Sequence, residues 1–281
     1  MARGRVDGEA GWRGLRTLGL PAGRRFRRLP GAGHILSLWT LMAAWWLLSL
    51  LLSETVLPGP WTTVRLLVEE VTRGHLLHHL GVSLRRVAMA FTLAMGAGSA
   101  AGAAMGASRL VNGLLEGWML VGLSLPRIVY IVLAYVLLGL NDRAAVAAVA
   151  LSVAPSVAAQ VRAATQAVDH GLVEMARAFR RSPAVVWVRV VTPQLLPHVL
   201  GAARGALSLA WKMVVFAELM GRTDGVGYQI SFFFQMFDMG GILAYALATI
   251  LVVALLDLGV LGTVERLAFR WRRPTWDREE R

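Results

Sequence analysis

The chain has 281 residues, of which 56% are hydrophobic and only 16% are charged. Soluble domains carry about 25% charged residues, so this composition disfavours a soluble enzyme and favours a protein embedded in lipid. The net charge of +12 gathers at the ends of apolar segments, which fits membrane orientation better than nucleic-acid binding. The sequence contains no cysteine, which excludes disulfides, thiol catalysis and cysteine-bound metals.

Residues 1–33 hold eight arginines with several glycines, and we interpret them as a flexible basic tail. Apolar stretches long enough to cross about 30 Å of hydrocarbon as helices follow. Six membrane-spanning helices are predicted, at residues 35–56, 87–107, 117–140, 144–164, 203–221 and 241–264. The expected fold is therefore an all-α integral membrane protein, a six-transmembrane-helix bundle over residues 34–271, with a short C-terminal tail at 272–281.

The loop between the first two spans is an amphipathic stretch, residues 61–79. Its three histidines, at positions 75, 78 and 79, have the spacing of a metal site, but few carboxylates accompany them, so a solvated interfacial face is the preferred interpretation. In the second span, Gly98, Gly102 and Gly106 share one helix face. Small residues at this spacing allow another helix to approach closely.

Proline residues interrupt the third and fourth spans, at Pro126 and Pro155. Such interruptions are tolerated in a membrane where neighbouring groups or a wet cavity satisfy the freed carbonyls. Two kinked helices fit a solute pathway and equally fit a bundle that is simply kinked.

Four ionisable side chains are expected at membrane depth: Arg127, Lys212, Glu218 and Asp257. A charge there costs roughly 2.5–3.5 kcal/mol, so it normally faces protein or water. The two cations either pair with the two carboxylates or make a pathway favourable to an anion. Extension of the charged groups to the interface is a third interpretation.

The distribution of arginine predicts the orientation. Nineteen arginines lie on the side of both termini and at most six on the other. Because basic residues favour the cytoplasmic side, both termini and the polar connection at 166–200 are expected there.

The polar connection contains a periodic segment. Leu172, Met175, Ala176 and Phe179 follow helical spacing and form one apolar stripe, with charged residues on the other side. Ser182-Pro183 and Thr192-Pro193 are each typical of a helix start, so short helices joined by sharp turns are predicted. Periodicity alone fits an interfacial loop or a docking helix that sits in a partner's groove.

This segment resembles the EAA motif of binding-protein-dependent ABC transporter permeases, which starts here at Glu174 and ends with VVTPQLLP at 190–197. The family's usual glycine is Arg180, which makes the turn between helices less certain because glycine adopts positive φ without cost. Residues 209–230 resemble the fifth-span segment of the same family. The sequence DLGVLGTVERLAFRW is similar to the C-terminal end of the nitrate/sulfonate/taurine-type permeases, and the interrupted third and fourth spans also fit that subfamily. The likeness covers about residues 75–271.

The resemblance implies a permease subunit of an ATP-driven importer for a small anion, in a bacterial inner membrane. It implies a second permease copy, separate ABC ATPase subunits that hold ATP and magnesium, and an extracytoplasmic solute-binding protein. The residues that would couple to the ATPase are Leu172, Glu174, Met175, Ala176, Arg177, Ala178, Phe179, Arg180, Pro193 and Pro197.

The sequence itself indicates no enzymatic activity and no cofactor of its own. A Walker A motif needs a lysine before serine or threonine, and the only lysine, Lys212, precedes Met213. Two other classes remain as alternatives. An integral-membrane transferase would need clustered polar residues at one membrane face, and a channel or membrane scaffold would need no docking segment.

Overall fold

The computed structural model describes residues 32–263, and every regular element in that range is a helix. The predicted tails, apart from residues 32 and 33, lie outside the described residues, as do residues 264–271. The helices are α1 (Ala32–Leu51), α2 (Pro60–Thr72), α3 (His75–Ala107), α4 (Arg109–Ser124), α5 (Arg127–Leu138), α6 (Asp142–Gln166), α7 (His170–Ala178), α8 (Pro183–Val186), α9 (Thr192–Gly221), α10 (Val226–Gln235) and α11 (Met239–Leu255), with π-helical turns at Trp187–Val191 and Leu256–Leu261.

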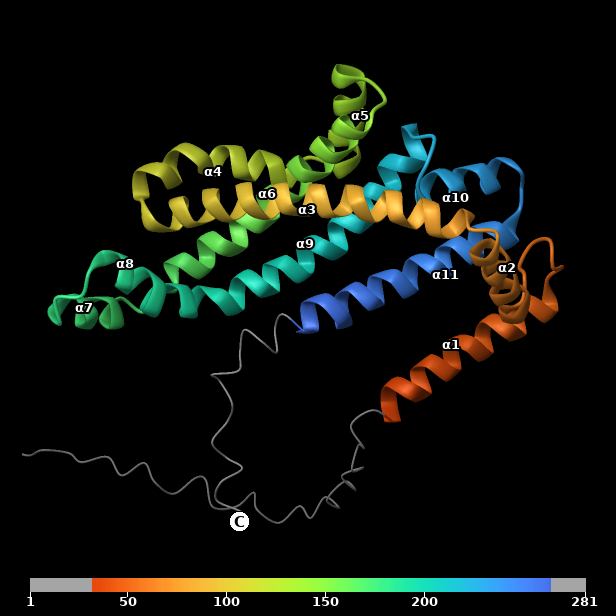
Figure 1. Ribbon diagram of the computed structural model, residues 1–281, viewed down its shortest axis with the longest axis horizontal. Helices are drawn as coiled ribbons and strands as arrows, with labels where there is room; N and C mark the ends of the chain where they lie inside the picture. The colour runs from red at the N-terminus through yellow and green to blue at the C-terminus, as the bar shows by residue number, and fades with distance from the viewer. Residues whose placement is uncertain (1–31, 264–281) are drawn as a thin grey trace, which may run out of the picture. The chain divides into compact units, whose positions relative to one another are not determined.

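The chain divides into two units inside α1, between Trp45 and Trp46. The described part of the first unit is the beginning of α1, an apolar helix whose side chains are mostly exposed. Its Thr40 hydroxyl donates to the carbonyl of Ser37 at 2.8 Å, so this polar group is satisfied within the helix. The second unit contains all the other helices (Figure 1).

Four of the described helical stretches are long and apolar enough to cross a membrane: His75–Ala107, Asp142–Gln166, Pro183–Gly221 and Met239–Gly259. A fifth candidate is the pair α4 and α5, which passes the same test jointly but is bent by 98°. The first predicted span corresponds to a shorter apolar helix, Ile35–Leu51. All six predicted regions are therefore helical within the described residues, and four of them are unbroken spans.

The two prolines behave differently. Pro126 separates α4 from α5, so the predicted interruption is a complete break. The Tyr130 hydroxyl donates to the carbonyl of Gly122 across this break at 2.9 Å. Pro155 lies inside α6, which continues through it. A Cβ on Gly122 would lie 2.7 Å from the Pro155 ring, so α4 packs directly on this proline.

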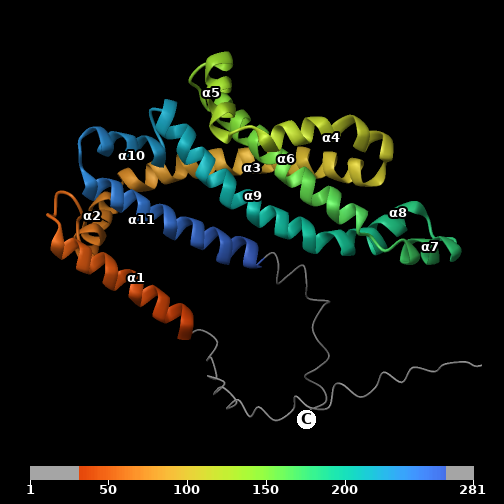
Figure 2. The same cartoon turned by 180° about the vertical axis from the view of Figure 1, so that it is seen from behind.

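The core of the second unit forms around α6. This helix is rich in valine and alanine. In its most apolar 18-residue stretch 61% is buried, compared with 28% in the corresponding stretch of α3. α3 and α9 pack against it, and Trp211 of α9, only 1% exposed, belongs to the apolar core that these helices share. Figures 1 and 2 show α7 and α8 at one end of α9 and α10 at the other.

The three glycines of α3 face α6. A Cβ on Gly98 would lie 2.7 Å from the carbonyl oxygen of Ala154, and one on Gly102 would lie 2.4 Å from that of Ala158. A Cβ on Gly106 would lie 2.4 Å from the Thr165 side chain. Because real side chains do not approach so closely, the contact between α3 and α6 requires glycine.

Three helices begin well before their predicted spans. α3 starts at His75 rather than at residue 87, α4 at Arg109 rather than at 117, and α9 at Thr192 rather than at 203. The added turns contain polar residues, which hydropathy counts against a membrane span. The three histidines therefore belong to the first turns of α3, and the amphipathic helix before it is only α2.

Candidate functional site

α7 is anchored to the rest of the polar connection by one face. The carboxylate of Asp169 caps its first turn by accepting from the amide of Gly171 at 2.8 Å. Val173 and Ala176 point inward and join a small apolar cluster formed with α6, α8 and the start of α9. The position of this short helix is thus determined by burial as well as by its cap.

The adjoining face of α7 is apolar and exposed. Leu172, Met175 and Phe179 are 42%, 52% and 73% exposed, and Glu174 and Arg177 are exposed beside them. The predicted stripe therefore lies at the edge of the buried face, because Ala176 is buried while the three larger side chains are exposed. Exposed apolar side chains gathered on one helix are a candidate interaction surface.

α7 ends in a turn with left-handed backbone at Arg180, whose φ is +52°. The amide of Arg180 donates to the carbonyl of Arg177 at 2.8 Å, and that of Arg181 donates to the carbonyl of Ala176 at 3.3 Å. This is the Schellman pattern, in which the left-handed position is usually glycine. The turn therefore persists with arginine at the position where the resembled motif has glycine.

Beyond this turn, Ser182 caps α8 and Pro183 is its first residue, as predicted. The helix start predicted at Thr192-Pro193 is confirmed, because α9 begins at Thr192 with Pro193 in its first turn, but the sharp turn predicted there is absent. The π-helical turn Trp187–Val191 joins α8 to α9, so Pro183–Gly221 is continuous. A wider π turn accommodates a proline, which cannot donate a helical hydrogen bond.

A hollow of about 640 Å³ lies between α7 and the start of α9. The amide of Asp169 donates to Gln194 at 2.9 Å and holds the two helices at this spacing. The residues that line the hollow are Leu172, Met175, Arg189, Val190, Pro193, Gln194, Pro197 and His198. The structure thus brings two of the exposed α7 residues together with both predicted prolines.

The two carboxylates have other partners than the predicted cations. Glu218 is fully buried and receives a hydrogen bond from Arg86 at 2.8 Å, and the half-exposed Asp257 pairs with Arg204 at 2.8 Å. Arg127 and Lys212 are exposed. Pairing between these cations and carboxylates, one of the three interpretations, is therefore wrong.

Arg86 is the residue that the sequence analysis missed. It is fully buried and binds three carboxylates, those of Asp142, Glu218 and Asp224. Arg85 and Arg222 also pair with Asp142, at 3.0 and 2.9 Å. The three arginines and three carboxylates, which we call the Arg86 cluster, balance in charge, as buried ions require. The predicted second span began at residue 87, so Arg86 was counted outside it.

The Arg86 cluster adjoins the start of α10. The amide of Gly225 donates to Nδ1 of His79 at 3.0 Å, that of Val226 to Oγ of Ser83 at 2.9 Å, and that of Gly227 to Oε2 of Glu218 at 3.0 Å. We call these three contacts the α10 clamp. They satisfy helix-end amides that have no partner within a helix.

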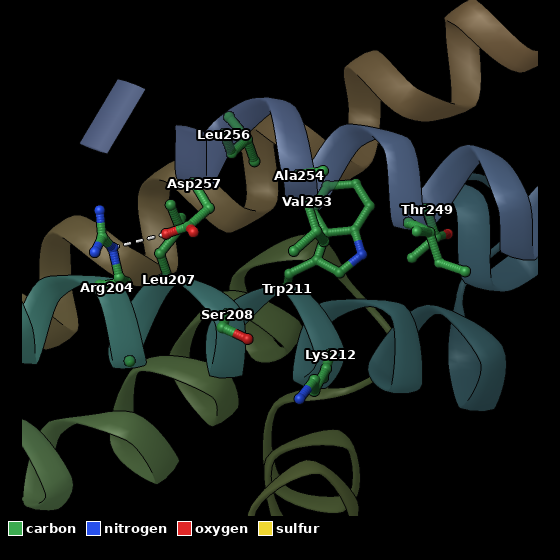
Figure 3. A pocket seen from close by; sticks show the side chains of 12 residues that line it. Arg204, Leu207, Ser208, Trp211, Lys212, Thr249, Val253, Ala254, Leu256 and Asp257 are labelled. Atoms are coloured by element: carbon green, nitrogen blue, oxygen red, sulfur yellow. Dashed lines mark ion pairs between the residues drawn. The ribbon is translucent and has the colours of Figure 1, made fainter. Parts of the chain in front are cut away.

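Lys212 lines a cavity of about 620 Å³ between α9 and α11. Figure 3 shows the Trp211 indole between the two helices and the Arg204–Asp257 pair near one end, whereas the Lys212 side chain leaves α9 on the side opposite Trp211. The cavity wall is mainly aliphatic. It combines an apolar surface with a few charged groups, as ligand cavities do.

Residues 94–273 match the family model described as "Binding-protein-dependent transport system inner membrane component". The chain belongs to this permease family. A probable ABC transporter permease protein of Brucella melitensis is 31% identical over 84% of this chain and 92% of its own length. The taurine transport system permease protein of Escherichia coli is 27% identical over 82% and 86%. The nitrate import permease protein of Synechococcus elongatus is 22% identical over 85% and 87%.

The fold agrees with the family. A chain of the inward-facing MetNI methionine ABC transporter superposes with a TM-score of 0.62 at 18% identity, covering 71% of this permease and 98% of that chain. The permease is thus a membrane-spanning transport subunit of the ABC importer class and not an enzyme. Permeases of this family work in systems that depend on a binding protein.

Proposed function

We propose that this permease forms the solute pathway of an ATP-driven importer and couples to separate ATPase subunits through residues 170–197. In the proposed assembly two copies of the permease pair with each other, and an extracytoplasmic binding protein delivers the solute. The observation that carries the coupling proposal is the outward apolar face of α7, formed by Leu172, Met175 and Phe179.

The geometry of the segment supports a docking role. α7 is fixed on its inner face by Val173 and Ala176, so its outer face is presented rigidly. The continuous helix from Pro183 to Gly221 leads from this surface to the far end of α9. A movement imposed on α7 and α8 by an ATPase would therefore be transmitted along one helix through the membrane.

The proposed solute is a small anion. Two relatives have names that refer to taurine, which carries a sulfonate group, and nitrate. Arg127 and Lys212 are exposed cations, and Glu218 and Asp257 pair with other arginines, so the charge of these two cations is available to attract an anion. Uptake of taurine and nitrate by the assembled transporter, compared with a neutral amino acid and a cation, tests this solute class.

Glu174→Arg tests the coupling surface. The substitution reverses an exposed charge beside the apolar face, so the permease should reach the membrane at normal levels while solute-stimulated ATP hydrolysis is lost. ATP hydrolysis by the reconstituted transporter is the measurement. Glu54→Arg is the matched control, because Glu54 is equally exposed but lies between α1 and α2. Normal uptake by the Glu174 variant would count against docking through α7.

A further inference from the structure

His79 is the member of the α10 clamp whose side chain can gain a proton in mild acid. Its Nδ1 accepts the hydrogen bond from Gly225, so that nitrogen carries no proton. The neutral ring then has its proton on Nε2, which lies 2.6 Å from Nε2 of Gln229. Rotation of the Gln229 amide by 180° places its oxygen at this position, where it accepts the Nε2 proton. A protonated ring would have donors at both nitrogens, and Nδ1–H would face the donor N–H of Gly225.

The groups around His79 do not remove this conflict. Asp224, in the loop before α10, has its charge held by the Arg86 cluster. Glu70 of α2 accepts from a tyrosine hydroxyl of α11 and lies 4.0 Å from the ring of His75. His75 and His78 share the first turns of α3 with His79, and the ring of His78 meets that of His79 edge-on. Tyr228 of α10 also contacts the His79 ring.

Repulsion also acts on α10 itself. The N-terminus of a helix carries a partial positive charge of about half a unit, so a nearby imidazolium is unfavourable there. Gly225 has φ of +104°, and a Cβ on Gly227 would lie 2.0 Å from the carbonyl oxygen of Val215. The start of α10 is therefore closely fitted against α9, with little room for a repelled group to adjust in place.

We propose that protonation of His79 releases the N-terminus of α10, which is held at neutral pH and freed in acid. The held state requires the neutral ring, so it is present at high pH and is lost as the pH falls and the ring gains a proton. The release itself does not depend on any solute. α10 lies at the end of α9 opposite the coupling segment (Figures 1 and 2). Any effect of this release on solute transport rests on the proposed function.

The absence of cysteine allows a direct test on the detergent-solubilised full chain. Val226→Cys places a thiol at a fully buried position of the clamp, and Phe234→Cys places one at a position that is 67% exposed on the same helix. Each is labelled with a maleimide between pH 7.5 and 5.5. The ratio of the two rates cancels the intrinsic pH dependence of the thiol reaction. We expect this ratio to rise about three- to tenfold in acid, as the loss of one hydrogen bond implies.

His79→Gln supplies an acceptor oxygen that does not titrate, so the acid-induced rise should disappear. A variant with both His75→Gln and His78→Gln is the matched control and should keep the rise. In a second supporting outcome, the Val226→Cys thiol in the His79→Gln background is labelled at pH 7.5 as fast as it is at pH 5.5 with His79 present. Glutamine then fails to replace the neutral imidazole, which shows that the neutral His79 ring holds the start of α10.

A flat ratio in the wild type overturns the proposal, and so does a rise that survives in His79→Gln or that vanishes in the double histidine control. These outcomes are independent of the coupling test. An importer that fails to couple through Glu174 can still release α10, and a permease whose α10 stays fixed can still couple.

Discussion

At the scale of single residues, Arg86 determines how three helices and a loop meet. Its guanidinium joins α3 to the start of α6, the end of α9 and the loop before α10. Arg86 and Glu218 are both fully buried, so neither charge has water as an alternative partner. Removing one member of such a group leaves the other charges uncompensated, which costs more than the pairing itself contributes.

Arg86→Met should therefore destabilise the protein by about 3–5 kcal/mol. Unfolding of the purified chain in a dodecyl sulfate titration, followed by circular dichroism, measures this loss. Arg85→Met is the adjacent control: its side chain is 62% exposed and its pairing with Asp142 should be worth less than about 1 kcal/mol. The double variant with Glu218→Met should recover part of the loss. Equal effects of the two single arginine variants would contradict a structural role for the cluster.

Arg180 shows what residue identity predicts at a single position. Position 180 holds arginine where the resembled motif has glycine, so the turn after α7 could not be predicted with glycine's conformational freedom. The structure keeps the turn, because two backbone hydrogen bonds and the Ser182 cap that follows act together on it. An arginine in left-handed backbone costs about 1–2 kcal/mol. That cost is small enough for the surrounding contacts to offset, so composition at one position does not decide the local fold.

At the scale of elements, the contact between α3 and α6 depends on the glycine face of α3. Helices in lipid have no hydrophobic drive to associate, so close packing of small residues supplies much of the attraction. The spacing of Gly98, Gly102 and Gly106 predicted such a face, and the structure places all three against α6. Which helix would be the partner could not be predicted, since every span offers apolar surface.

Gly102→Ala should destabilise this contact by about 1–3 kcal/mol, because the added Cβ would lie 2.4 Å from the carbonyl oxygen of Ala158 and would force the helices apart. Gly96→Ala is the control on the same helix. Nothing lies within 4 Å of a Cβ there, so the better helix propensity of alanine should stabilise the chain by up to about 1 kcal/mol. The same dodecyl sulfate titration measures both, and shifts in the same direction would contradict packing through the glycine face.

Hydropathy located the membrane helices but misplaced their ends, and this had consequences for the site. α3 and α9 extend beyond their apolar stretches because polar residues there are satisfied by other helices, which a single-sequence pattern does not reveal. Arg86 was excluded from the predicted span by one position for this reason. The effect of each proline on its helix also depends on the residues packed around it. Pro126 ends a helix, Pro155 fits against Gly122 within α6, and the turn at Thr192-Pro193 is absorbed by a π turn.

At the scale of the whole molecule, orientation links the two ends of α9 to different compartments. The side of the chain that carries nineteen arginines should be cytoplasmic. Phe179 belongs to that side, at the end of α7, whereas Phe237 lies between α10 and α11. The membrane-spanning stretch Pro183–Gly221 separates the two phenylalanines in the sequence. They are 73% and 88% exposed, so a thiol at either position is within reach of a reagent.

In sealed spheroplasts, a membrane-impermeant maleimide should label Phe237→Cys and leave Phe179→Cys unlabelled, because only the former lies on the outer side. After permeabilisation both should react, which shows that each thiol is accessible and that only the bilayer separated Phe179 from the reagent. The chain has no other cysteine, so the label reports a single site. Labelling of Phe179→Cys before permeabilisation would place the polar connection outside the cell. No ATPase could then reach α7, and coupling through residues 170–197 would be excluded.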